Sequence, residues 1–284
     1  FEITHEGVLI TDHNNIVVHI NPAFTQITGY NLEDVLGQTP SMFKSGRHKA
    51  DFYQALWTSL ETTDEWSGEV WNRRKNGEIL PQYQTIRSIR DENGLISHNV
   101  AVFSDISLLK SSQSELNHLA RHDPLTGLAN RAQLNERLTQ TLHKSLEQGK
   151  NSTLFLIDLD HFKTINESLG HSVGDQVLQS IAQRITGIID QKKCTLARIG
   201  GDEFVVICES THNPAEAATM AQALIQASKQ PFMLNNNELF ISASVGVCLF
   251  PESGQTVEEI MRNADSALSK AKDSGRDTFA FYSS

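Results

Sequence analysis

The stretch Arg198-Ile199-Gly200-Gly201-Asp202-Glu203-Phe204 places two glycines and two carboxylates between two short apolar runs. The runs, 195–199 and 204–208, are rich in β-branched and apolar residues, which predicts two strands joined by a hairpin with the glycines at its tip. Glycine tolerates positive φ and lets a ligand approach the backbone, while carboxylates bind divalent cations or accept protons. Taken alone, the same residues are also typical of a solvated turn, because tight turns collect Gly and Asp for conformational reasons.

A second polar cluster follows the apolar run 154–157, which predicts a buried strand. A helix expected to begin near His161 places Asn166 and Gly170 on one face, and a break is expected before a further helix over 176–189. The cluster comprises Asp158, Asp160, His161, Phe162, Lys163, Asn166, Gly170, His171, Gly174 and Asp175. Together the two clusters supply metal ligands and groups that can read a base.

Further motifs extend this pattern over the C-terminal half of the chain. They are Asp123-Pro124-Leu125-Thr126-Gly127-Leu128-Ala129-Asn130-Arg131, Ser244-Val245-Gly246, and Ala264-Asp265-x-Ala267-Leu268-x-x-Ala271-Lys272-x-x-Gly275-Arg276. With the two clusters, this ordered set resembles the GGDEF domain of diguanylate cyclases. The resemblance implies a nucleotidyl-cyclase-like central sheet flanked by helices. It also implies an enzyme that condenses two GTP molecules, one on each subunit of a dimer, into cyclic di-GMP and two pyrophosphates.

The resemblance also implies a metal and catalytic residues. The ligands of Mg²⁺, with Mn²⁺ as the alternative, would be Asp158, the carbonyl oxygen of Leu159, Asp202 and Glu203. Asp202 and Lys163 would be the catalytic residues, with Asp202 accepting the proton of the ribose hydroxyl. A carboxylate with an ordinary pKa of about 4 is a weak base for that hydroxyl, so metal polarisation has to supply much of the driving force.

Substrate binding is assigned by the same resemblance to Phe162, Lys163, Asn166, His171, Asp175, Gly200, Gly201, Lys272 and Arg276. Asn166 and Asp175 match the guanine-reading pair, since a carboxylate can accept from both N1–H and N2–H of guanine, and adenine lacks that donor pair. His171 either lines this pocket or caps a helix. Lys163, Lys272 and Arg276 would hold the triphosphate. On a helix ending at Gly275, Lys272 and Arg276 would stack in the last turn, where the helix dipole alone also favours cations.

The chain departs from the family where many members bind their product. That site has the pattern Arg-x-x-Asp and begins nine residues before the first hairpin glycine, where this chain has Gln191 and Cys194. An amide and a thiol cannot replace the forked contacts of a guanidinium. We therefore expect no feedback inhibition at this position.

Length and composition are consistent with two domains. The chain has 284 residues and is 39% hydrophobic, enough for two cores. Its net charge of −10 argues against binding nucleic acid, and no run is long and apolar enough to span a bilayer. Cys194, Cys208 and Cys248 lie in or beside apolar runs, which favours buried thiols in a reducing, cytoplasmic compartment. Because the chain begins at Phe1, we expect a fragment whose parent could be tethered to a membrane.

The first 105 residues have a different pattern. Five strands are expected at 7–12, 16–21, 69–74, 79–89 and 98–105, with a short helix opened by Pro22. Together with Asn21-Pro22-Ala23-Phe24-x-x-Ile27-Thr28-Gly29-Tyr30 and Trp66-Ser67-Gly68-Glu69, this antiparallel pattern resembles a PAS sensor domain.

The PAS resemblance implies a cavity that holds haem, flavin, a small acid or nothing. No Cys occurs in residues 1–108, which excludes photoactive cysteinyl-flavin chemistry. His48 is expected to be an exposed loop residue rather than a haem ligand, and Trp57, Trp66 and Trp71 are more often core residues than flavin neighbours. We expect no covalent cofactor and leave a flavin open.

The expected fold class is α+β, with a PAS domain at 1–105, a helical linker at 106–121 and a GGDEF domain at 122–284. In the linker, Ile106, Leu109, Gln113, Leu116 and Ala120 form a short heptad seam that favours a homodimer through the PAS domain and linker. The linker could instead be an amphipathic helix packed on its own domain. The expected function is a PAS-regulated diguanylate cyclase. The alternative is a silent GTP-binding regulatory module of a larger PAS–GGDEF–phosphodiesterase protein.

Overall fold

The computed structural model describes residues 5–209, 211–234 and 237–283. The chain divides into two compact units, Phe1–Glu115 and Leu116–Ser284, and each is described by itself. No helix in these described ranges is both long and apolar enough to cross a membrane.

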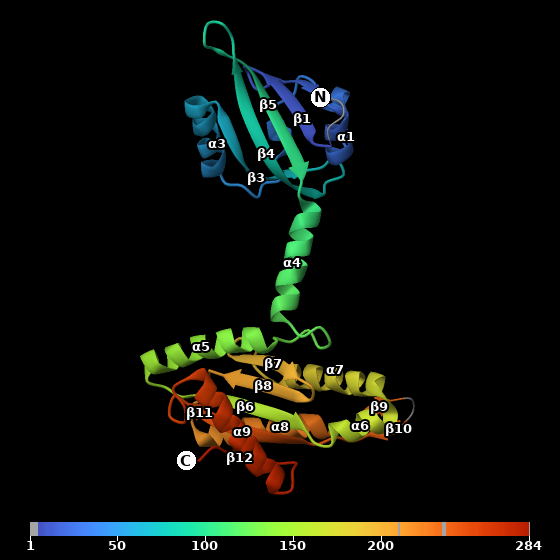
Figure 1. Ribbon diagram of the computed structural model, residues 1–284, viewed down its shortest axis with the longest axis vertical. Coiled ribbons are helices and arrows are strands. Elements are labelled where there is room, and N and C mark those ends of the chain that lie inside the picture. The colour runs from blue at the N-terminus through green and yellow to red at the C-terminus, as the bar shows by residue number, and fades with distance from the viewer. Residues whose placement is uncertain (1–4, 210, 235–236, 284) are drawn as a thin grey trace. The chain divides into compact units, whose positions relative to one another are not determined.

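The N-terminal unit contains one antiparallel sheet of five strands (Figure 1). Its spatial order is β2 (Val17–Ile20), β1 (Gly7–Asp12), β5 (Ile96–Asp105), β4 (Ile79–Arg90) and β3 (Glu65–Arg73). Every neighbouring pair is antiparallel, so the predicted five-stranded sheet is confirmed.

Short helices connect β2 to β3, and they are α1 (Pro22–Thr28), α2 (Leu32–Val35), a 3₁₀ helix (Pro40–Phe43) and α3 (Ala50–Thr63). Asn21 begins α1, because its Oδ1 accepts from the Phe24 N–H at 2.9 Å and from the Val8 N–H at 2.8 Å. The Phe24 ring then packs edge-on against Phe43 and Phe103. These contacts make one small core on one face of the sheet.

Helix α4 (Ser107–Arg121) follows β5 directly. Leu108, Leu109, Leu116 and Leu119 of this helix are all exposed. Apolar side chains that face solvent along one helix are typical of a surface that binds another protein.

A second five-stranded sheet forms the centre of the C-terminal unit (Figure 1). Its order is β12 (Phe279–Phe281), β11 (Ala243–Phe250), β6 (Ser152–Leu159), β8 (Glu203–Cys208) and β7 (Cys194–Gly200). Only β11 and β12 are parallel among these neighbours in the described chain. A small hairpin of β9 (Phe232–Leu234) and β10 (Asn237–Leu239) stands apart from the sheet.

Helices cover both faces of this sheet. Side chains of α6 (Phe162–Leu169), α7 (His171–Ile188) and α8 (Pro214–Lys229) pack on one face, and those of α5 (Arg131–Gln148) and α9 (Val257–Asp273) pack on the other. Because β6 lies at the centre, its residues are buried on both sides: Phe155 and Ile157 face α7 and α8, and Leu154 and Leu156 face α5 and α9. The buried part of β6 therefore holds Asp158, near the end of the strand, in a fixed position.

Helix α9 lies close to β11 because of a glycine. A Cβ at Gly246 would come within 2.1 Å of the Ala264 carbonyl oxygen and 2.5 Å of the Leu268 nitrogen. Only glycine permits this approach. The close packing fixes the C-terminal end of α9 beside the end of β6.

Two predicted helix boundaries were wrong. Helix α7 begins at His171, and Gly174 and Asp175 lie within its first turn rather than in a break before it. The chain turns at Gly170 instead, where φ is 88°. Helix α9 ends at Asp273, so Arg276 lies beyond the helix and does not stack with Lys272 in its last turn.

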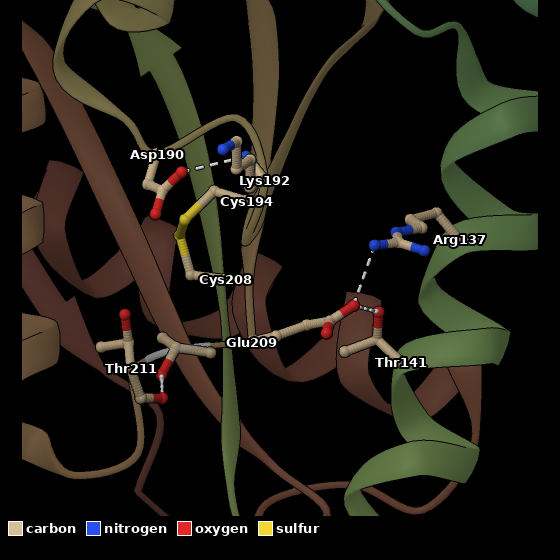
Figure 2. The surroundings of a disulfide bond; sticks show 9 residues. Arg137, Thr141, Asp190, Lys192, Cys194, Cys208, Glu209 and Thr211 are labelled. Carbon is tan, nitrogen blue, oxygen red and sulfur yellow. Dashed lines mark hydrogen bonds and ion pairs between the residues drawn. A yellow bond between two sulfur atoms is a disulfide. The ribbon is translucent and has the colours of Figure 1, made fainter.

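The prediction of three free thiols was also wrong, because Cys194 and Cys208 form a disulfide (Figure 2). They are direct partners in the β7–β8 register, with their Cα atoms 4.2 Å apart. The bond joins the two hairpin strands at the end away from the Gly200–Gly201 tip. Cys248 is a buried free thiol, and burial raises its pKa to about 12. Because two of the three cysteines are bonded to each other, the cysteines do not support the expectation of a reducing compartment.

Candidate functional site

Asp158 and Glu203 face each other across two neighbouring strands. They are direct partners in the β6–β8 register, at the end of β6 and the beginning of β8. Burial raises the pKa of Asp158, the charges of Asp202 and Asp160 act in the same direction, and Lys272 opposes them. Burial also raises the pKa of Glu203, and the charges of Asp158 and Asp202 add to this effect. A cation bound here would relieve the crowding of negative charge.

Lys272 supplies part of the positive charge that compensates these carboxylates. Its Nζ lies 2.8 Å from Oδ2 of Asp158; the Asp158 side chain is largely buried and that of Lys272 is about one-third exposed. The predicted phosphate-binding lysine therefore lies at the predicted metal site. In the described ranges no three His, Cys, Asp or Glu side chains are grouped so that they could hold a metal alone. Mg²⁺ is commonly bound by one or two carboxylates plus substrate phosphates, so Asp158 and Glu203 fit that ion.

The hairpin has the predicted position and a two-residue turn. Gly200 pairs with Glu203, which leaves Gly201 and Asp202 in the turn. The φ angles of Gly200 and Gly201 are 145° and 52°, values that other residues rarely adopt. A Cβ at either glycine would meet no atom within 4 Å, so the space above the tip is open to a ligand.

Helices α6 and α7 bring the predicted base-reading residues into one region. A Cβ at Gly174 would lie 1.9 Å from Oδ1 of Asn166, so the Asn166 side chain rests on the first turn of α7. Asp175 is the next residue of that turn and is exposed. His171 is the first residue of α7 and is also exposed, but the N-cap position is Gly170.

Two predicted phosphate-binding cations are exposed. Lys163, in the first turn of α6, lies 3.6 Å from Glu167. Arg276 follows α9 and has a positive φ of 65°. Its guanidinium makes no hydrogen bond or ion pair with the residues that the structure describes, so it is free to bind an anion.

Sequence reasoning missed the role of Asp160. This carboxylate is 3% exposed and accepts hydrogen bonds from Ser242, Ser244 and the backbone N–H of Asp277. Its position two residues after Asp158, on a chain leaving a buried strand, was the only signal in the sequence.

Comparison with known families identifies the C-terminal unit. Residues 120–278 match the family model described as "Diguanylate cyclase, GGDEF domain". The chain belongs to the GGDEF diguanylate cyclase family. Residues 1–106 match the PAS fold, so a PAS domain precedes the GGDEF domain.

Curated relatives and a solved structure agree with this membership. The bifunctional diguanylate cyclase/cyclic di-GMP phosphodiesterase MucR of Pseudomonas aeruginosa is 42% identical over 62% of this chain and 25% of its own length. An uncharacterized signaling protein of Caulobacter vibrioides is 30% identical over 98% of this chain and 34% of its own length. The GGDEF domain of TpbB from P. aeruginosa superposes with a TM-score of 0.55 and 35% identity, covering 57% of this chain and 95% of that structure. The chain thus spans about a quarter to a third of these two relatives.

The PAS domain contains a partly open cavity of about 350 Å³. Apolar side chains form most of its wall, and they include Leu9, Phe24, Phe43, Leu56, Trp57, Val70, Leu80, Ile86, Ala101 and Phe103. Thr11 and Gln82 line it as well and are almost fully buried. The Thr11 hydroxyl has no hydrogen-bond partner in the described chain. An unpaired buried hydroxyl at a cavity wall favours a ligand with a hydrogen-bonding group.

His48 lies in a loop, as expected, but it is half-buried rather than exposed. Its Nε2 accepts the Trp71 N–H at 2.9 Å, its ring stacks on Phe52, and burial lowers its pKa. Neither His48 nor any other described His, Cys or Met lines the cavity. The residues present therefore do not fit a haem with such a ligand.

Proposed function

We propose that this GGDEF domain condenses two GTP molecules into cyclic di-GMP and two pyrophosphates. The observation that carries the proposal is the Asp158–Glu203 pair with Lys272 at its edge, directly beside an open Gly-Gly turn. Two partly buried carboxylates and a lysine form a site for a metal-bound triphosphate.

Each residue group has its own task. Asp158 and Glu203, with the Leu159 carbonyl oxygen, would hold Mg²⁺ or Mn²⁺. The bound ion would neutralise triphosphate charge and make the ribose hydroxyl more acidic. Asp202, in the turn, is the proposed proton acceptor and a further ligand. Gly200 and Gly201 leave room for the nucleotide at the turn.

Cations then hold the leaving group. Lys163 and Arg276, both exposed, with Lys272, would bind the triphosphate, and the backbone at Phe162 would contribute an N–H donor. At the other end of the substrate, Asn166 and Asp175 would read guanine, with His171 beside them. An adenine lacks the two donors from which Asp175 would accept, so a carboxylate that the bound base shields from water would stay unpaired, which costs roughly 1–3 kcal/mol.

A homodimer completes the reaction, because one site holds one GTP and the attacking hydroxyl belongs to the other. The exposed leucines of α4 support pairing through this helix, extended by the PAS domains. We place the reaction in the cytoplasm, where GTP is available.

A second function deserves a test because of the relatives. MucR combines a cyclase with a phosphodiesterase, and this chain spans a quarter of it. A silent GTP-binding module of a larger protein would keep nucleotide binding without turnover. The hairpin residues Asp202 and Glu203 are both present, which favours the active enzyme. Comparison of the rate of product formation by wild type and Asp202→Ala decides between them: the active enzyme loses most of its rate, and a silent module has none to lose.

We also propose that the PAS cavity binds a regulatory ligand with an apolar body, a neutral hydrogen-bonding edge and an acidic end. Thr11 and Gln82 would meet the edge, and Lys44 and Arg73 are the only charged residues in the described wall. Flavin mononucleotide fits this description. Titration with that flavin, followed by its fluorescence, should show saturable binding that Gln82→Leu weakens; no binding by the wild type would rule it out.

A further inference from the structure

The buried carboxylate of Asp160 joins the end of β6 to the corner that follows α9. Its Oδ1 accepts the Ser244 hydroxyl at 2.7 Å, and its Oδ2 accepts the Ser242 hydroxyl at 2.6 Å and the Asp277 backbone N–H at 3.1 Å. Hydrogen bonds to an ionised acceptor are stronger than those between neutral groups. Asp160 is thus a fixed anchor for the backbone between Arg276 and Asp277.

That corner needs an anchor, because three successive residues have positive φ. The values are 107° for Gly275, 65° for Arg276 and 54° for Asp277. A non-glycine residue in this region costs roughly 1–2 kcal/mol, so two in succession persist only when other contacts hold them. Here the Asp277 carboxylate also pairs with Lys229 at 2.6 Å.

The corner carries a side chain that the proposed reaction uses. Arg276 is held through its backbone on both sides, since its own N–H donates to the Ala271 carbonyl at 3.2 Å and the next N–H donates to Asp160. Its guanidinium is exposed and, within the described chain, unpaired. Asp158, two residues before Asp160, pairs with Lys272 of the preceding helical turn. The end of β6 therefore supplies the metal-binding carboxylate, and the end of α9 with the corner after it supplies two phosphate-binding cations.

We propose that Asp160 is a positioning residue for triphosphate binding, which acts by fixing the left-handed corner that presents Arg276. This inference rests on the proposed function, in which Arg276 contacts the triphosphate. A preorganised cation loses less freedom when the nucleotide binds, so the effect falls on phosphate affinity rather than on the chemical step.

Asp160→Asn tests the proposal because it keeps the size of the side chain while replacing one acceptor oxygen with a donor. The KM for GTP should rise about tenfold, the loss expected for a hydrogen bond to a charged group, while kcat changes less than about twofold. Binding of the α,β-methylene analogue of GTP should weaken equally, and GMP binding should not change. Equal losses for the triphosphate and GMP would overturn the proposal.

A double-mutant cycle separates positioning from general damage to the fold. In an Arg276→Ala background, Asp160→Asn should change the KM by less than about twofold, because its effect passes through Arg276. The same fold-change in both backgrounds would contradict the proposal. Ser242→Ala, a milder change at the same carboxylate, should act in the same direction and covers the case in which Asp160→Asn does not fold.

Thr153→Val is the matched control. Thr153 lies in β6, the strand that ends just before Asp160, at the far end from the corner; it is fully buried and donates a 2.9 Å hydrogen bond to the Thr211 carbonyl. The Thr153→Val variant should have a lower free energy of unfolding than wild type, and the ratio of its affinities for the triphosphate and for GMP should be unchanged. If wild type binds neither nucleotide, the proposed function fails with the inference; if wild type binds both and Asp160→Asn matches it, only the inference fails.

Discussion

Arg198 joins Asp123 to the tip of the hairpin. Its Nη1 donates to both carboxylate oxygens of Asp123, at 3.0 and 2.9 Å, while its Nε and Nη2 donate to the Gly201 carbonyl at 3.0 and 2.7 Å. Both members of this ion pair are largely buried. The segment that follows α4 is thereby linked through one guanidinium to the turn that carries the proposed proton acceptor. Asp123 lies two residues after that helix.

Asp123→Asn should therefore destabilise the domain in a pH-dependent way. Burial alone would raise the pKa of Asp123, but hydrogen bonds from Thr126 and the Arg198 guanidinium outweigh it and lower the pKa. A lowered pKa stabilises the fold above the unfolded value of about 4, and that contribution is lost as the pH falls through the folded value. In urea unfolding, the variant should lose about 2 kcal/mol at pH 7, and the difference should shrink below pH 4. A loss that stays constant down to pH 3 would contradict the role of the carboxylate charge.

Gly246→Ala should destabilise the GGDEF domain by about 1–3 kcal/mol, because its Cβ would enter the backbone of α9. It should also weaken GTP binding, since α9 carries Lys272. Gly187→Ala is the matched control, because Gly187 lies in α7 and a Cβ there meets nothing within 4 Å. That change should stabilise the domain by up to about 1 kcal/mol. If Gly246→Ala and Gly187→Ala changed the free energy of unfolding equally, close packing of α9 on Gly246 would not contribute to stability.

The disulfide predicts a simple count of thiols. Protein purified and denatured without reductant should show one free thiol, that of Cys248, and three after reduction. Reduction should lower the unfolding free energy by about 3 kcal/mol, the loss expected for a loop of this length. Three reactive thiols before reduction would exclude the bond under those conditions.

Base selectivity should depend on Asp175. Asp175→Asn replaces one acceptor oxygen with a donor, so it should raise the KM for GTP about tenfold or more and narrow the preference for GTP over ATP. Glu167→Gln, on the neighbouring helix α6, is a control that should leave this preference unchanged. A preference unaffected by Asp175→Asn would remove this residue from base recognition.

The sequence correctly predicted those elements whose structure is determined by residues close together in the chain. The hairpin turn at Gly201 and Asp202, the strand before Asp158 and the five strands of the PAS domain follow from patterns within a few residues. Where contacts between distant residues decide, prediction failed. Gly174 looked like a helix break, yet it lies inside α7, where Asn166 packs on it.

The disulfide and Asp160 illustrate the same limit. Cys194 and Cys208 are opposite only because the hairpin register pairs them. The serine partners of Asp160 lie more than 80 residues away in the chain, at the beginning of β11, whose place beside β6 no local pattern reveals. Both features depend on strand register, which the sequence pattern does not state.

Product formation tests the central claim most directly. The purified chain is incubated with GTP and Mg²⁺, and the nucleotides are separated by chromatography, with Glu203→Ala as the control. The proposed function predicts cyclic di-GMP and pyrophosphate from wild type and little or none from Glu203→Ala. GTP that is bound but not converted by the wild type would contradict the claim and favour the silent regulatory module.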